Sequence, residues 1–135
     1  MPKPIRCILL IDDDPDDNFL HRMVIEESGL CEEVRVAENG PEAIAYLTHV
    51  ESPYYLRPDL IFLDINMPGM NGFEFLEEYE TLPPEQKNGR VLLMLTTSLN
   101  PADKNKASQF STVGGYHAKP LTQAMLTQII HQYFQ

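Results

Sequence analysis

The sequence has few cysteines, few basic residues and no long hydrophobic run. Cys7 and Cys31 form neither a CxxC pair nor a disulfide framework, so we expect buried thiols in a reducing cytoplasm. Ten lysines and arginines against twenty acidic residues give a formal net charge of −10, which argues against nucleic-acid binding through a basic surface. No apolar stretch approaches the ~18 residues of a membrane span, and the N-terminus does not read as a signal peptide.

The remaining composition is that of an ordinary globular domain. An apolar fraction of 43% and a charged fraction of 22% are typical values, and 135 residues are enough to bury a full core. We find no internal repeat, low-complexity tract or interdomain linker. We therefore expect one domain, residues 1–135.

Short apolar runs alternate with helical patterns along the whole chain. Four runs cover 7–11, 60–63, 91–95 and 113–118, and a weaker run near 33–37 alternates as an edge strand does. Strands that alternate with helices are typical of a parallel sheet covered on both faces. The sequence therefore predicts an α/β fold with a doubly wound parallel sheet, built from five βα units.

Cap residues indicate where the intervening helices begin. Asp14 suits an N-cap, Pro15 suits the first helical position and Gly29 suits the end of the first helix. The apolar residues at helical spacing within it are Phe19, Leu20, Met23 and Val24. Further helices are expected after Asn39-Gly40-Pro41, near Gly72, after Asn100-Pro101 and from about Thr122, with Pro83-Pro84 stopping the third.

Reactive polar residues stand where the predicted strands end. Asp12 and Asp13 follow the first run, Asp64 follows 60–63, Thr96 follows 91–95 and Lys119 follows 113–118. The carboxyl ends of parallel strands line one crevice, so we expect these side chains to meet there. Three acids, a hydroxyl and an ammonium are a set that can hold Mg²⁺ and accept a phosphoryl group.

The three acids need a cation to offset their charge, because like charges a few ångströms apart cost stability. Mg²⁺ prefers oxygen ligands and keeps several waters. We expect Asp13 and Asp64 to supply one carboxylate oxygen each, the backbone carbonyl of Asn66 a third, and Asp12 to order a bound water. With Mg²⁺ and Lys119 present, the resting site is close to neutral.

Phosphorylation of Asp64 would add roughly one negative charge to this site, together with oxygens that need hydrogen-bond donors. Lys119 can pair with one of these oxygens. The Thr96 hydroxyl can donate to another if its loop moves inward. A local change of charge would thereby become a loop movement.

These residues resemble those of the receiver domains of two-component response regulators, over essentially the entire chain. The matching residues are Asp12-Asp13, Asp64 within 63–72, Thr96 and Lys119-Pro120. The resemblance implies a flavodoxin-like (βα)₅ sheet in the order 2-1-3-4-5, as in the chemotaxis receiver. It implies that Asp64 takes a phosphoryl group from a histidine kinase or phosphotransfer protein with Mg²⁺ bound. It also implies a cis peptide at Lys119-Pro120.

The same resemblance implies how the signal is passed on. Tyr116 matches an aromatic switch whose ring swings inward when Thr96 engages the phosphoryl group, although an ordinary half-buried tyrosine is the alternative. Asn66 and Ser98 match positions that tune the lifetime of the phosphoryl group. We therefore expect a phosphoacceptor switch rather than an enzyme.

The surface that would change is the face formed by the helix after Pro101, the strand 113–118 and the helix after Thr122. A downstream protein would read this face, and family members often form homodimers through it. We expect no fused output domain, and with its long loops the chain resembles small stand-alone receivers, including partners of bacterial phytochromes. We expect neither nucleic acid nor a membrane as a partner.

Three other classes of protein share part of this pattern. Aspartyl-phosphate phosphohydrolases place a second catalytic acid two residues after the nucleophile, where this chain has Asn66. A flavodoxin-like cofactor carrier needs a phosphate loop after its first strand, and the acidic run 12–16 would repel a flavin phosphate. A degenerate receiver used only for binding is disfavoured because Asp64, Thr96 and Lys119 are all present.

Other polar residues have simpler interpretations. Asp16 and Asp17 extend the acidic run. In the first turn of a helix, their negative charges interact favourably with the positive end of the helix dipole, so we expect a capping role rather than metal binding. None of the four histidines has metal-ligand spacing. Solvated or packing roles are expected for all four: His21, His49, His117 and His131.

Overall fold

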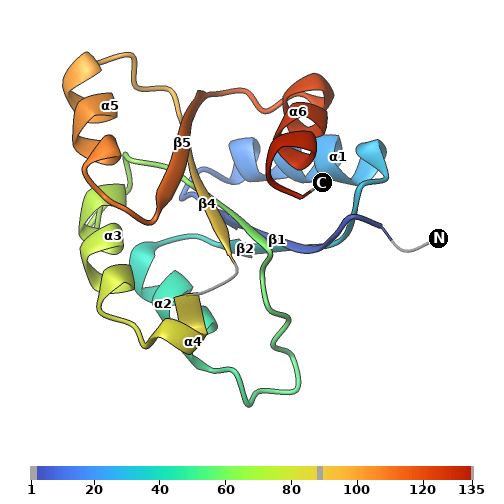
Figure 1. Ribbon diagram of the computed structural model, residues 1–135, viewed down its shortest axis with the longest axis horizontal. Helices are drawn as coiled ribbons and strands as arrows, with labels where there is room; N and C mark the ends of the chain where they lie inside the picture. The colour runs from blue at the N-terminus through green and yellow to red at the C-terminus, as the bar shows by residue number, and fades with distance from the viewer. Residues whose placement is uncertain (1–2, 88–89, 135) are drawn as a thin grey trace.

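The computed structural model describes residues 3–87 and 90–134 as a five-stranded parallel sheet with helices on both faces (Figure 1). The strands are β1 (Ile5–Ile11), β2 (Cys31–Ala37), β3 (Leu60–Leu63), β4 (Val91–Thr96) and β5 (Val113–Ala118). The helices are α1 (Pro15–Ser28), α2 (Gly40–Thr48), α3 (Gly72–Glu80), α4 (Pro84–Lys87), α5 (Pro101–Ser108) and α6 (Gln123–Tyr133). In this part of the chain, no helix has the length and apolar character needed to cross a bilayer.

The strand order is β2-β1-β3-β4-β5, and every neighbouring pair is parallel. The predicted fold class and strand order are therefore confirmed. In this order the first strand lies between the second and the third, so the carboxyl ends of β1 and β3 are neighbours. That edge of the sheet is where an open α/β sheet binds its ligands.

The cap residues act as the sequence predicted. The Asp14 side chain accepts hydrogen bonds from the backbone N–H groups of Asp16 and Asp17, and Pro15 begins α1. Gly29 ends that helix with φ +69°, a left-handed conformation that favours glycine. Helices α2, α3, α5 and α6 likewise begin after Asn39, Asn71, Asn100 and Thr122, each of which caps its helix with its side chain.

Two features of the fold differ from the prediction of five βα units. A sixth, short helix, α4, follows α3, because a proline that cannot continue one helix is well suited to the first turn of the next. Thr96 is the last residue of β4 rather than the first residue after it. The sheet therefore holds the backbone of Thr96, and the loop to α5 begins after it.

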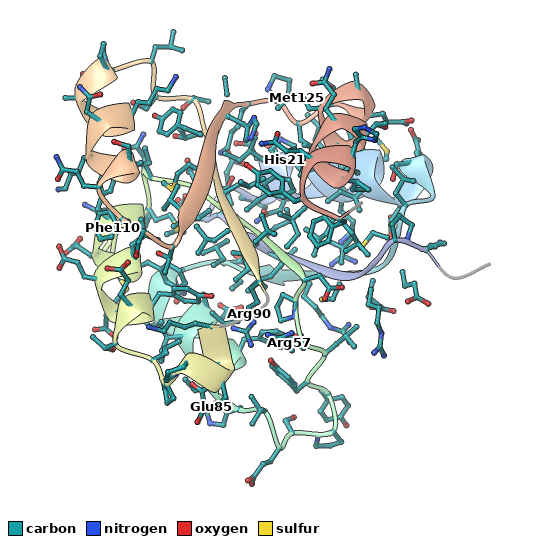
Figure 2. The ribbon with its side chains drawn as sticks, in the orientation of Figure 1. His21, Arg57, Glu85, Arg90, Phe110 and Met125 are labelled. Atoms are coloured by element: carbon teal, nitrogen blue, oxygen red, sulfur yellow. The ribbon has the colours of Figure 1, made fainter. Side chains whose placement is uncertain are left out.

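Two hydrophobic clusters fill the two faces of the sheet. One lies beneath α1 and α6 and includes Ile25 and Leu126; the other lies beneath α2, α3 and α5 and includes Phe75 and Ala107. Figure 2 shows Met125 and Phe110, which pack against the first and the second cluster respectively. The central strands are buried on both sides, which explains why they read as continuous apolar runs.

The face of α1 that packs against the sheet differs from the face predicted from four apolar residues, which are Phe19, Leu20, Met23 and Val24. Of those four residues, only Val24 packs against the core. The other three are exposed: Phe19 by 68%, Leu20 by 41% and Met23 by 40%. The buried residues of α1 are Asn18, His21 and Ile25. The inner face of α1 is therefore partly polar, because it borders the crevice at the strand ends.

The two cysteines are buried free thiols, as predicted. They lie on the neighbouring strands β1 and β2. Burial raises the pKa of Cys7 to about 12 and that of Cys31 to about 11. Both thiols therefore stay protonated at neutral pH and act as small apolar side chains.

Candidate functional site

The sheet brings the five predicted residues into one crevice at the carboxyl ends of its strands. Asp12, Asp13 and Asp64 offer carboxylate oxygens that all lie within 4.8 Å of one another. The Lys119 Nζ lies 2.6 Å from the Asp12 Oδ2 and 3.5 Å from the Asp64 Oδ2. Thr96 is fully buried at the end of β4, the strand next to β3, and its hydroxyl lowers the pKa of the Asp64 carboxyl. The predicted meeting of these side chains is present in the structure.

Asp64 is a buried carboxylate, and its environment disfavours the charged form. Burial is the largest cause that raises its pKa, and the negative charge of Asp12 acts in the same direction. The charge of Lys119, the Thr96 hydroxyl and the hydrogen bond from the Ile65 backbone N–H oppose the shift, and the net effect is a raised pKa. A nearby cation would therefore be favourable here.

Lys119 is fixed by both its backbone and its side chain. Its backbone N–H donates to the Thr96 carbonyl at 2.9 Å, and its peptide bond to Pro120 is cis, as the family resemblance implied. The side chain is only 7% exposed. Burial lowers the pKa of its ammonium, but hydrogen bonds to Asp12 and Asp17 and the charges of Asp64 and Asp12 outweigh burial and raise it. Lys119 therefore remains charged.

A tight loop carries the chain from Asp64 to α3. The Gly72 N–H donates to the Ile65 carbonyl at 2.8 Å, which folds the loop back on the end of β3. Gly69 adopts φ +78°, a conformation that favours glycine. Asn66 lies on this loop two residues beyond Asp64 and is exposed. Its expected contribution of a backbone oxygen to a metal site remains a prediction.

The loop between β4 and α5 links Thr96 to Tyr116. The Thr96 Oγ1 accepts a hydrogen bond from the Ser98 N–H at 3.3 Å, and the Ser98 hydroxyl donates to the Asp103 Oδ2 at 2.6 Å. The hydroxyl of the half-buried Tyr116 donates to the Ser98 carbonyl at 3.1 Å. A movement of Thr96 would therefore shift Ser98 and, through Ser98, Tyr116.

Sequence reasoning missed one ion pair in this crevice. The Asp17 Oδ2 lies 2.8 Å from the Lys119 Nζ, whereas we expected Asp17 only to oppose the dipole of α1. Asp17 does lie in the first turn, but the side chain that caps the helix is that of Asp14. The sequence did indicate that Asp17 and His21 share a face of this helix, because the two residues are one helical turn apart.

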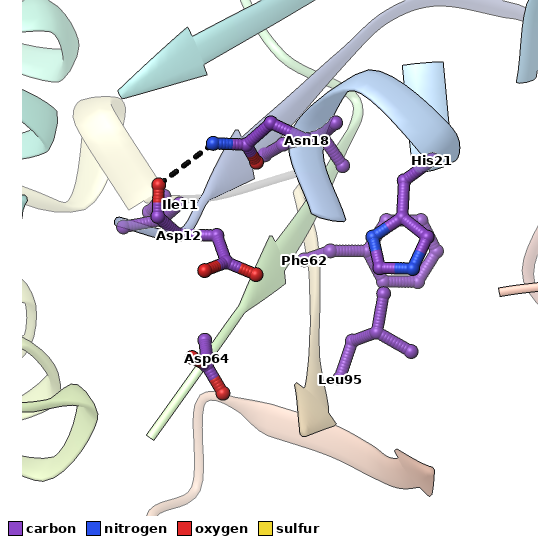
Figure 3. A pocket seen from close by; sticks show the side chains of 8 residues that line it. Ile11, Asp12, Asn18, His21, Phe62, Asp64 and Leu95 are labelled. Atoms are coloured by element: carbon purple, nitrogen blue, oxygen red, sulfur yellow. Dashed lines mark hydrogen bonds between the residues drawn. The ribbon is translucent and has the colours of Figure 1, made fainter. Parts of the chain in front are cut away.

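Sequence reasoning also missed the polar lining of a small cavity behind the carboxylates. The cavity has a volume of about 10 Å³, and its polar lining consists of Asp12, Asp64, Asn18 and His21 (Figure 3). The Asn18 Nδ2 donates to the Asp12 carbonyl at 2.8 Å, which ties α1 to the end of β1. Within the described chain, the Asn18 Oδ1 and the His21 Nε2 are buried without a hydrogen-bond partner.

His21 is a packing residue and not a solvated one. Its side chain lines the cavity together with Phe62 and Leu95, and the residue is only 2% exposed. Burial lowers its pKa, the charge of Lys119 lowers it further, and the charges of Asp17 and Asp12 oppose this without reversing it. The imidazole is therefore held in its neutral form near neutral pH.

This fold and this site define a class of protein: a doubly wound α/β domain with an acidic crevice and one buried lysine. The model of the response regulator receiver domain matches residues 8–131, and the chain belongs to this family. It is therefore a receiver domain of two-component signalling.

Similar proteins agree with this assignment. Response regulator Rcp1 of Synechocystis sp. is 34% identical over 104 residues, which cover 74% of this chain and 67% of Rcp1. A two-component response regulator from Cytophaga hutchinsonii has a TM-score of 0.86 and 34% identity, with 98% of each chain covered.

Two further similar structures are a metal-bound and a phosphorylated response regulator. The Mn²⁺-bound form of response regulator Rcp1 has a TM-score of 0.76 and 28% identity, covering 96% of this chain and 95% of that one. The phosphorylated cyanobacterial phytochrome response regulator RcpA has a TM-score of 0.73 and 32% identity, covering 94% and 89%. The resemblance to phytochrome-partner receivers is thus confirmed.

Proposed function

We propose that Asp64 accepts a phosphoryl group from a histidine kinase or phosphotransfer protein, and that this event is the signal the chain carries. The observation that supports this most directly is the position of the Asp64 carboxylate. It lies at the carboxyl end of β3, 3.5 Å from the Lys119 ammonium and within 4.8 Å of Asp12 and Asp13. It is therefore a nucleophile surrounded by the charges that phosphoryl transfer needs.

The proposed reaction is a displacement at phosphorus. An Asp64 carboxylate oxygen attacks the phosphorus of a phosphohistidine, so that a P–O bond forms as the P–N bond breaks. The imidazole of the kinase leaves with the electron pair of that bond and takes up a proton. Lys119 is placed to pair with a phosphoryl oxygen, and Thr96, on the neighbouring strand, to donate to another.

The donor set fits Mg²⁺. Asp13 and Asp64 would each supply a carboxylate oxygen, the Asn66 backbone carbonyl would supply another, and Asp12 would hold a water of the ion. All are hard oxygen donors, and the raised pKa of Asp64 indicates that a cation is favourable here. When bound, the ion would offset the negative charge on the phosphoryl oxygens. The Mn²⁺-bound form of Rcp1 supports a divalent ion in a related receiver.

We further propose that the signal leaves through the face formed by α5, β5 and α6. The hydrogen bonds from Ser98 to Thr96 and from Tyr116 to Ser98 supply a physical connection to this face. A surface hollow of about 330 Å³ is lined by Tyr116 and by Leu99, which is 86% exposed. Rotation of the Tyr116 ring would change the shape of that hollow, which a downstream protein or a second copy of the chain would read.

The experiment is to incubate the protein with acetyl phosphate and Mg²⁺ and to follow its mobility on a Phos-tag gel. The parent protein should give a shifted band, Asp64→Asn should give none, and Asp16→Asn, an exposed acid nearby, should behave as the parent does. A shift that persists in Asp64→Asn would place the acceptor elsewhere. Rapid multiple turnover of a phosphomonoester would instead favour a phosphohydrolase.

A further inference from the structure

The Lys119 ammonium is shared among three carboxylates, and they are not equivalent. The Nζ lies 2.6 Å from Asp12 and 2.8 Å from Asp17, and it donates a hydrogen bond to each. Asp64 lies farther away, at 3.5 Å. The ammonium is therefore drawn toward the end of β1 and the first turn of α1, away from the proposed acceptor.

Of the three carboxylates around Lys119, Asp17 is the one whose position is least explained by the fold or by the acidic cluster. Asp12 is buried at the end of β1 and belongs to the acidic cluster, while the Asp17 side chain is 33% exposed and lies outside that cluster. Helix α1 does not require it either, since Asp14 caps that helix. Its hydrogen bond to a lysine that is only 7% exposed is thus the main interaction that places it in the crevice.

The contact between Asp17 and Lys119 affects how the ammonium can respond to a phosphoryl group on Asp64. An ammonium has three N–H donors, and Asp12 and Asp17 each accept from one of them. A phosphoryl group on Asp64 would bring negative oxygens that need the same cation. Two anions that share one cation compete for it, and the competition is strong where the lysine is shielded from water.

We propose that Asp17 is a positioning residue that holds Lys119 on the α1 side of the crevice in the unphosphorylated state and competes with the phosphoryl group for it. This inference rests on the proposed acceptor role of Asp64. In this receiver, phosphorylation then has to draw Lys119 away from Asp17. Asp17 thereby lowers the stability of the phosphorylated state relative to the resting state.

The test is the affinity for beryllofluoride, a stable mimic of a phosphoryl group on aspartate, measured at saturating Mg²⁺ by NMR titration. Asp17→Asn keeps the size of the side chain and removes its charge, so it should bind beryllofluoride about three- to tenfold more tightly than the parent. Asp17→Glu keeps the charge and should bind much as the parent does. Damage to the fold can only weaken binding, so an increase is diagnostic.

Asp16→Asn is the matched control, because Asp16 also lies in the first turn of α1 but is exposed. It tests the loss of one charge and of its interaction with the helix dipole, and its affinity should equal that of the parent. An equal rise in Asp16→Asn, or no rise in Asp17→Asn, would overturn the inference. Failure of the parent to bind beryllofluoride would reject the proposed acceptor role and the inference with it.

A second measurement does not depend on phosphorylation. The change in Tm caused by Asp17→Asn is compared in the parent and in Lys119→Ala, both without metal. If Asp17 acts through Lys119, its removal should be less favourable when the lysine is present than when it is absent. Equal changes in Tm would show that the two residues are not coupled, which would contradict the inference even if beryllofluoride binds.

Discussion

Gly72 lies against the main chain of Asp64. A Cβ atom at position 72 would stand 2.5 Å from the Asp64 carbonyl oxygen and 2.9 Å from the Ile65 Cα, distances at which the backbone has to shift. The start of α3 is thus packed directly onto the residue that we propose as the acceptor. Because Gly72 is buried, neither segment can relieve the contact by moving into solvent.

We therefore expect Gly72→Ala to lower the free energy of unfolding by about 1–3 kcal/mol, the usual cost of overpacking a buried site. The same substitution at Gly114, where a Cβ would meet nothing closer than 3.4 Å, should be neutral or slightly stabilising. Urea denaturation of the two variants and the parent measures the difference. Equal stability of Gly72→Ala and the parent would show that this contact relaxes easily.

The crowded carboxylates predict an unusual effect of Asp64→Asn. The pKa of Asp64 is raised, chiefly by burial, so above that pKa the folded protein carries a charge that its environment disfavours. In metal-free buffer at neutral pH, the variant should therefore have a higher Tm than the parent. A lower Tm in the absence of metal would mean that the ion pair with Lys119 outweighs the cost of burial.

Mg²⁺ should reverse this order. A ligand that binds only the folded state at 100 times its dissociation constant stabilises it by about 2.7 kcal/mol, and the parent should gain an amount of this order. Asp64→Asn and Asp13→Asn each lose a proposed ligand and should gain much less. Thermal melts across a Mg²⁺ titration measure the gain, with Asp16→Asn as the control. An equal gain in all four proteins would place the ion elsewhere.

The meeting of the strand-end residues could be predicted from the sequence because a parallel sheet places the carboxyl ends of its strands along one edge. Runs such as 60–63 and 91–95 are apolar throughout, so their ends are visible, and the topology brings those ends together. The ion pair of Asp17 with Lys119 was not predictable in the same way. It depends on how α1 is rotated about its axis, and the apolar residues Phe19 and Leu20 indicated the wrong face.

That rotation leaves an apolar patch on the surface, formed by Phe19, Leu20 and Met23, on the helix that begins beside the acidic crevice. We expect Phe19→Ala to reduce the rate of phosphoryl transfer from a cognate histidine kinase by about tenfold, a moderate loss for an interface side chain. Its free energy of unfolding should change by less than about 0.5 kcal/mol, because the residue is exposed.

Small-molecule phosphorylation separates docking from chemistry for this variant. Phe19→Ala should take up phosphate from acetyl phosphate at the rate of the parent. Tyr54→Ala is a suitable control, since Tyr54 is 83% exposed but lies on the loop that precedes β3. Kinase transfer that is unchanged in Phe19→Ala, or equally reduced in Tyr54→Ala, would argue against a role of this patch in docking.

His21 links the pH dependence of stability to the cavity behind the carboxylates. Burial and the charge of Lys119 hold its pKa below the ordinary value of about 6.5, although Asp17 and Asp12 oppose this. The unfolded chain therefore binds the proton more tightly than the folded one. The stability that depends on a neutral His21 is present above pH 6.5 and is lost as the pH falls toward the pKa of the folded state.

His21→Leu should remove this dependence, and it also removes a buried Nε2 that has no partner in the described chain, while Phe62 and Leu95 offer apolar contacts to the new side chain. We expect a gain of about 1 kcal/mol in unfolding free energy at pH 7.5 and a larger gain at pH 5. Urea denaturation in metal-free buffer at both pH values measures it, with the exposed His49→Gln as control. A gain that is the same at both pH values would mean that His21 does not titrate in this range, and a loss at pH 7.5 would mean that its ring makes contacts that leucine cannot replace.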